Sequence, residues 1–233
     1  MPNPILNDPL TLEALGEVRA ESLLPAQQPT SRGTLVSNDT YQQRLLKYPE
    51  RAVFHSYAEL IYAILLESRK TVTSLVPHPY LIYIKNRQYI PDFFVIDNGE
   101  RLVIELQSST DTAASNLALI ERYFFEEGIR FQVISNEEVL QQEAEARHWM
   151  RLIQVMVVAT RYGIDTKRDE FDILEQCQQN QTCVADVVHP GCREQWQREV
   201  ALYRLLHQHR LSTDLKNQYL DYDSELSYVV NVA

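Results

Sequence analysis

The sequence predicts an α/β protein in which a mixed sheet with flanking helices is followed by a smaller, mainly helical domain. Helix and strand patterns alternate between residues 49 and 142, which is typical of helices packed on a sheet. A strong hairpin signal lies within this region, where Asp97-Asn98-Gly99-Glu100 separates two apolar, β-branched runs. Helical patterns dominate residues 143–233, and residues 1–48 form an N-terminal extension.

Composition places the chain among ordinary globular proteins and limits its partners. Of the 233 residues, 45% are hydrophobic and 23% are charged, with a net charge of −10 and a pI near 5.1. This balance argues against a broad electrostatic surface for nucleic acid, so we expect DNA capture to rely on a local basic patch or a partner protein. No apolar run reaches the roughly 18 residues of a membrane span, and no signal peptide opens the chain, so we expect no membrane partner. Three cysteines without framework spacing favour a reducing compartment, which indicates a cytoplasmic protein.

The segments before the hairpin are predicted from their apolar patterns and from proline. Leu10 to Ala20 is predicted to be a helix that begins near a proline, and residues 25–38 are predicted to be a loop. His55 to Arg69 is predicted to be a helix. Val72 to Ile84 contains two prolines, so we expect a loop that leads into a strand near Tyr80 to Ile84.

Glu59 has two interpretations in the predicted helix. Ser56 is a candidate N-cap, and a glutamate three residues later completes a capping box. The helix has little polar surface, however, so a carboxylate near its start could instead point at the acids of the hairpin. The sequence favours neither interpretation, and one glutamate could serve both.

The hairpin brings two acids face to face if its loop has two residues. The count that pairs Phe93 with Ile104 places Asp92 directly opposite Glu105. Like charges at such a position are destabilising, and a bound divalent cation would explain them. A half-buried hairpin with a raised-pKa acid pair is the alternative without a metal, and a three-residue loop with a bulge would separate the pair. Gln107 follows Glu105 by two residues and therefore faces the same side.

The segments after the hairpin alternate between helix and strand before becoming mainly helical. Asn116 to Glu127 is predicted to be a helix that ends at Gly128. The remaining predictions are a buried strand at Phe131 to Ile134, helices at Trp149 to Tyr162, Phe171 to Gln178 and Arg193 to His209, and a final strand at Leu226 to Val232. Cys177, Cys183, His189 and Cys192 could hold zinc, but their irregular intervals favour ordinary loop and core roles.

A Pro-Asp pair followed after twelve residues by Glu-Leu-Gln on the adjacent strand resembles the core of the PD-(D/E)xK nuclease superfamily. From about Arg32 onward, the order of features resembles TnsA, the endonuclease subunit of heteromeric bacterial transposases. The matching segments are Ala58-Glu59-Leu60, Tyr89-Ile90-Pro91-Asp92-Phe93, Ile104-Glu105-Leu106-Gln107, the helix running to Tyr123, Val133-Ile134-Ser135 and Ser227-Tyr228-Val229-Val230-Asn231. This resemblance implies a restriction-endonuclease-like domain followed by a winged-helix-like domain.

The resemblance also implies a site and a reaction. Glu59, Asp92 and Glu105 would form the acidic set around Mg²⁺, for which Mn²⁺ could substitute, and Gln107 would be the fourth catalytic residue. The family normally has Lys at the position of Gln107, so this chain lacks an ammonium group that would offset phosphate charge. The implied reaction is cleavage of the 5′ strands at transposon ends during cut-and-paste transposition. The implied partners are transposon-end DNA, a TnsB-like transposase and a TnsC-like ATPase.

The missing lysine leaves an alternative open. A catalytically weak or inactive TnsA-like subunit could serve as an interaction scaffold for the transposase and its ATPase regulator. The two functions differ in whether Glu59, Asp92 and Glu105 converge on one cation site.

Overall fold

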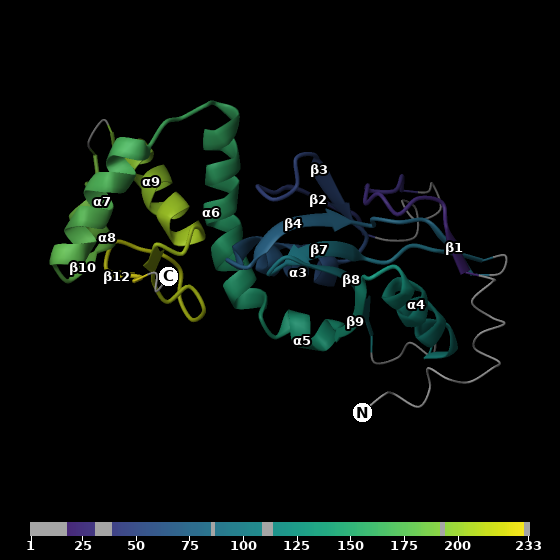
Figure 1. The fold of residues 1–233 in the computed structure, drawn as a ribbon. Helices are drawn as coiled ribbons and strands as arrows, with labels where there is room; N and C mark the ends of the chain where they lie inside the picture. The colour runs from purple at the N-terminus through teal and green to yellow at the C-terminus, as the bar shows by residue number, and fades with distance from the viewer. Residues whose placement is uncertain (1–17, 31–38, 85–86, 109–113, 192–193, 231–233) are drawn as a thin grey trace. The chain divides into compact units, whose positions relative to one another are not determined.

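The computed structural model is a mixed α/β structure, which confirms the predicted class (Figure 1). It describes residues 18–30, 39–84, 87–108, 114–191 and 194–230. Within these ranges the chain forms several sheets and seven helices. No helix in these ranges has the length and apolar character needed to span a membrane.

The chain forms two compact units, and each is built from several segments. Unit 1 consists of Met1–Gln43, Glu50–Ala63 and Thr71–Gln141, and unit 2 consists of Arg44–Pro49, Ile64–Lys70 and Gln142–Ala233. The division between them falls inside helix α3 (Tyr57–Ser68). Domain boundaries at residues 48 and 142 therefore remain predictions about which parts of the chain fold independently.

A four-stranded mixed sheet forms the centre of unit 1 (Figure 1). Its order is β4 (Val72–Pro77), β7 (Phe93–Asp97), β8 (Glu100–Gln107) and β9 (Arg130–Ser135). The first three strands are antiparallel, and β9 runs parallel to β8. A parallel neighbour needs a crossover connection, which contains helix α4 (Ala114–Glu126).

The β7–β8 hairpin has the predicted two-residue loop. Asn98 has a φ of 49° and Gly99 a φ of 80°, the left-handed values that both positions of a type I′ turn require. Phe93 pairs with Ile104, which confirms the predicted register. The alternative with a three-residue loop and a bulge is therefore wrong.

The predicted loop at the start of Val72 to Ile84 is also wrong, because these residues form strand β4. Leu75 and Val76 are buried, and their burial in the sheet outweighs the loop preference of the nearby prolines. Pro77 is tolerated because it is the last residue of an edge strand. The strand predicted after the loop is confirmed as β5 (Ile82–Ile84).

A three-stranded antiparallel sheet places β5 between β1 (Val18–Ala20) and β6 (Arg87–Tyr89). The helix predicted over Leu10 to Ala20 is therefore wrong at Val18–Ala20, and the rest of it lies outside the described residues. Pairing with β5 satisfies the backbone groups that a helix would have paired internally. A separate two-stranded ribbon joins β2 (Tyr41–Arg44) and β3 (Arg51–Phe54).

Two predicted helices, α3 and α4, contribute aromatic side chains to the core of unit 1. The Tyr62 ring of α3 meets the Phe93 ring of β7 edge to face, with centroids 5.6 Å apart. Phe124 of α4 is fully buried and stacks on Phe131 of β9. Gly128 has a φ of 66° and follows α4, as the predicted helix end requires. Strand β9 is less buried than predicted, since it is the edge strand and Val133 is 42% exposed.

Helices predominate in unit 2, and their predicted positions are confirmed. They are α6 (Glu143–Arg161), α7 (Lys167–Gln179) and α9 (Gln195–His207), with the short α8 (Val184–Val187) between the last two. Helix α5 (Asn136–Leu140) precedes them in unit 1. A small antiparallel sheet has the order β10 (Thr182–Cys183), β12 (Glu225–Tyr228) and β11 (Leu211–Ser212). The predicted final strand is thus present as β12, which ends earlier than Val232.

Candidate metal site

Asp92 is held between two strands directly before β7 begins. Its backbone carbonyl accepts the N–H of His78 at 2.8 Å, and its Oδ2 accepts the N–H of Leu106 at 2.6 Å. The β7–β8 register, continued by one residue, brings Asp92 opposite Glu105, as the sequence predicts. The hairpin and the end of β4 therefore fix the orientation of this carboxyl group together.

Three causes raise the pKa of Asp92 well above its ordinary value. Burial of the carboxyl group is the largest, followed by the charges of Glu105 and then Glu59. The hydrogen bond from Leu106 acts in the opposite direction but is outweighed. The three acids that the sequence singles out thus lie close enough for each of the other two to oppose ionisation of Asp92.

Tyr89 fixes the second acid of the hairpin. Its hydroxyl group donates a hydrogen bond of 2.6 Å to Oε2 of Glu105. Burial raises the pKa of Tyr89, and the nearby charges of Glu105 and Asp92 raise it further. The phenol therefore stays protonated and acts as a permanent donor to Glu105. The sequence assigns no role to Tyr89, because its contact depends on where β6 ends relative to β8.

Glu59 both supports the start of α3 and joins the buried polar cluster. Its backbone N–H donates to Oγ of Ser56 at 3.1 Å, while its Oε2 accepts the N–H of His55 at 2.9 Å. The same oxygen lies 2.9 Å from Nε2 of His78. Burial by itself raises the pKa of Glu59, but the hydrogen bond and charge of His78, together with the hydrogen bonds from His55 and Ser56, outweigh burial, and the pKa is lowered. The capping interpretation is therefore correct in part, whereas the carboxylate contacts His55 and His78 rather than the acids of the hairpin, although its charge acts on Asp92.

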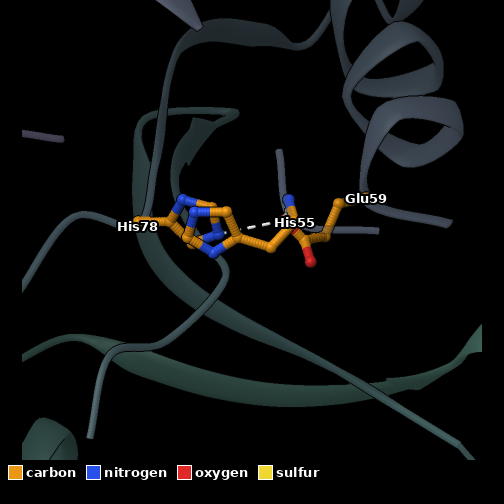
Figure 2. Close-up of side chains that lie close together, drawn as sticks. All are labelled: His55, Glu59 and His78. Atoms are coloured by element: carbon orange, nitrogen blue, oxygen red, sulfur yellow. Dashed lines mark hydrogen bonds and ion pairs between the residues drawn. The ribbon is translucent and has the colours of Figure 1, made fainter. Parts of the chain in front are cut away.

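Two histidines beside Glu59 were not predicted from the sequence. The rings of His55 and His78 lie face to face with centroids 4.0 Å apart, and the carboxylate of Glu59 lies beside them (Figure 2). Nε2 of His55 is 3.0 Å from Oγ1 of Thr30. Burial and the neighbouring His78 lower the pKa of His55. Twenty-two residues separate the histidines in the sequence without a motif, so only the folded sheet brings them together.

Gln107, the fourth predicted site residue, is the last residue of β8. It is half-buried and lies opposite Ser135 of β9 in the parallel pairing. It follows Glu105 by two residues on the same strand, so the two side chains lie on the same face of the sheet. An amide can orient a water or a phosphate oxygen by hydrogen bonding but carries no charge.

The cysteine-containing segment does not form a metal site in the part of the chain that the structure describes. There, three or more potential ligands converge only at His55, Glu59 and His78. Cys177 is buried, and burial raises the pKa of its thiol. Cys192 lies outside the described residues.

The site therefore contains two groups of potential ligands. Asp92 and Glu105 form an oxygen-rich group, and His55 and His78 form a nitrogen-containing group together with Glu59. Carboxylates of the first kind suit Mg²⁺, while imidazoles suit transition metals. The sequence matches no protein-family model and no curated protein.

Proposed function

We propose that this protein is a metal-dependent DNA endonuclease subunit of a transposase, which cleaves the 5′ strands at transposon ends. The observation that carries the proposal is the placement of Asp92 opposite Glu105 across the β7–β8 hairpin, with Glu59 close enough for its charge to act on Asp92. The same three residues are the acids of the TnsA-like pattern. The proposal extends to a restriction-endonuclease-like arrangement of unit 1 and a winged-helix-like arrangement of unit 2.

The donor set fits Mg²⁺. Carboxylate oxygens are hard ligands, and a divalent cation would offset the repulsion between Asp92 and Glu105 that otherwise opposes ionisation. Asp92 and Glu105 would hold the ion, and Glu59 would add negative charge nearby. Bound Mg²⁺ lowers the pKa of water and stabilises negative charge on a phosphate undergoing hydrolysis.

The surrounding residues orient these donors before DNA arrives. The N–H of Leu106 fixes Oδ2 of Asp92, and the hydroxyl group of Tyr89 fixes Oε2 of Glu105. Such supporting hydrogen bonds keep ligating carboxylates in place and tune metal affinity. Gln107 would position a water or a phosphate oxygen, and it would leave more of the phosphate charge unneutralised than Lys does.

The test combines metal binding with strand-resolved DNA cleavage. We expect Mg²⁺ or Mn²⁺ to bind the full-length protein in isothermal titration and to support cuts in the 5′ strands of transposon-end DNA with the partner transposase present. Asp92→Ala should remove both signals. Glu100→Gln changes an exposed acid at the opposite end of the same hairpin, so it should remove neither. Loss of both signals in the Glu100 variant as well would show that the loss is not specific to the site.

A non-catalytic scaffold subunit is the second candidate, favoured by Gln107 and by the net charge of −10. Metal binding without DNA cleavage in the wild type would support it. Gln107→Lys should then restore cleavage if the missing charge is the defect. If the wild type does cleave DNA, a drop in cleavage on Gln107→Lys would contradict the role assigned to Gln107.

A further inference from the structure

A buried nitrogen-containing cluster lies where β3, α3 and β4 meet in unit 1. His55 follows β3 directly, Glu59 lies in the first turn of α3, and His78 follows β4. Each residue offers one ligand atom, and these atoms all lie within 4.8 Å of one another. Glu59 and His78 are 6% and 4% exposed, so the cluster is enclosed rather than spread over the surface.

We propose that His55, His78 and Glu59 bind one divalent transition-metal ion of the zinc class. This site goes beyond the nuclease proposal, since it uses different ligands and a different metal from the Asp92–Glu105 pair. Two imidazoles and one carboxylate are a common protein ligand set for zinc that leaves a coordination position open. Imidazole nitrogen also favours Zn²⁺, Co²⁺ and Ni²⁺ over Mg²⁺, which prefers oxygen ligands.

Hydrogen bonds already involve all three ligands. Nε2 of His55 lies 3.0 Å from Oγ1 of Thr30, so a donated Nε2–H leaves Nδ1 with the lone pair that binds metal. Such a partner on the other ring nitrogen is typical of metal-binding histidines. Oε2 of Glu59 lies 2.9 Å from Nε2 of His78, and a metal ion would take the place of the proton between them.

Closing the site requires only a small movement of side chains. Zinc–ligand distances of about 2.0–2.2 Å bring ligand atoms to roughly 3–4 Å from one another. The rings of His55 and His78 are nearly parallel, with an interplanar angle of 12°, so at least one ring must tilt for both to face a single ion (Figure 2). Nδ1 of His78 is buried and has no hydrogen-bond partner among the described residues. Tilting this ring therefore breaks no hydrogen bond at Nδ1.

The backbone connects this cluster to the oxygen-rich site. The N–H of His78 donates to the carbonyl of Asp92 at 2.8 Å, and the charge of Glu59 acts on Asp92. Any test of the imidazole site must therefore separate it from binding by Asp92 and Glu105. Asp92→Asn does so, because it removes a carboxylate ligand of the oxygen site and leaves the three residues of the imidazole site unchanged.

The experiment uses Co²⁺ as a spectroscopic probe of the full-length, chelator-treated protein, with Zn²⁺ as competitor. We expect about one Co²⁺ per chain in the Asp92→Asn protein, with a visible absorption band that Zn²⁺ removes and a large excess of Mg²⁺ does not. In the Asp92→Asn protein, His55→Gln should weaken Co²⁺ binding by about 100-fold or more, and Thr30→Val by about 10-fold. His189→Gln, which changes an exposed histidine of unit 2, should leave binding unchanged.

Circular dichroism melting curves of each variant distinguish a loss of Co²⁺ binding from a loss of folding. His55 is only half-buried, so His55→Gln remains decisive even if His78→Gln does not fold. Saturable Co²⁺ binding that survives in a folded protein with both Asp92→Asn and His55→Gln overturns the proposal. So does a folded wild-type protein that binds no Co²⁺, or binding that disappears in Asp92→Asn but not in His55→Gln.

Discussion

Asp92 is both tightly positioned and electrostatically unfavourable as an ion. Its carbonyl and its Oδ2 each accept a backbone N–H, yet burial, Glu105 and Glu59 all raise its pKa. A hydrogen-bonded carboxyl group at a strand end would more commonly have a lowered pKa. Removing this charge should therefore change both the stability of the fold and metal binding.

Asp92→Asn should stabilise the metal-free protein while removing Mg²⁺ binding. The folded state raises the pKa of Asp92 above its unfolded value, so ionisation at neutral pH destabilises the fold. Asn keeps an oxygen that can accept the N–H of Leu106 but carries no charge. We expect a gain of about 1 kcal/mol in the free energy of unfolding near pH 8, the upper size of a cross-strand charge effect. The gain should shrink as the pH falls and be nearly gone below about pH 3, where Asp92 is neutral in both states, and denaturant unfolding at about pH 8 and pH 3 checks this.

Mg²⁺ binding should weaken on acidification at a higher pH than an ordinary carboxylate site does. The metal needs the ionised form of Asp92, and protons compete for it up to the raised pKa. The pKa of Glu59 is lowered, so this residue stays ionised through the same range. Isothermal titration between about pH 5 and pH 8 in buffers of different ionisation enthalpy should reveal proton release on binding. Affinity independent of pH over this range would contradict the coupling between Asp92 and the metal.

Some of these residues can be found from the sequence and others cannot. The Asn98-Gly99 turn sets the register, and counting residues from it places Asp92 opposite Glu105 without further information. His55 and His78 come together through the fold of separate elements, which no local pattern encodes. The nuclease-like motif predicts the acids Glu59, Asp92 and Glu105 but contains no histidine, so it does not predict His55 or His78.

The same limit applies to whole elements. Helices α6 and α7 have strong apolar periodicity, α9 has a weaker one, and the hairpin has a specific turn, so all are predicted correctly. Strand β4 is missed because Pro77 at its end and Pro79 beyond it resemble a loop, although burial and pairing with β7 decide its structure. Strand β1 is missed because its three residues gain their structure only by pairing with β5, far along the chain.

The end of α3 carries a buried glutamate that belongs to unit 2. Glu67 is fully buried, and its carboxylate oxygens contact the N–H of Lys47 and Nε2 of His207, both at 3.0 Å. Glu67→Ala should lower the free energy of unfolding by about 2–4 kcal/mol, because both contacts lose their acceptor in the interior. Urea denaturation followed by circular dichroism measures this loss.

The matched control for this prediction is Glu67→Gln, which keeps the size of the side chain and one oxygen acceptor. Its loss of stability should be smaller than that of Glu67→Ala. Equal losses in the two variants would show that the negative charge of Glu67, rather than its role as an acceptor, stabilises this end of the helix.

The charge of the molecule and the organisation of its chain have separate consequences. The charge makes the proposed DNA binding dependent on a partner, and the organisation of the chain makes the folding of unit 2 dependent on segments from earlier in the sequence. A net charge of −10 gives little general attraction for DNA, so the proposed nuclease would rely on its transposase partner to reach the phosphate. The sequence places a boundary near residue 142 from a change in pattern. It cannot show that Arg44–Pro49 and Ile64–Lys70 belong with the C-terminal part, because those assignments depend on contacts distant in the chain.

Cutting the chain at the predicted boundary should therefore leave residues 143–233 incompletely folded. This fragment lacks the carboxylate of Glu67 that contacts His207 and the carbonyl of Ser68 that lies 2.8 Å from Nε2 of His209. We expect residues 143–233 to unfold with a broad, poorly cooperative transition, and a chain of residues 44–233 to retain a cooperative one. Thermal and urea unfolding followed at two spectroscopic probes would measure this difference. If residues 143–233 unfold cooperatively and as stably as the longer chain, the boundary at residue 142 is correct and the two earlier segments are dispensable to unit 2.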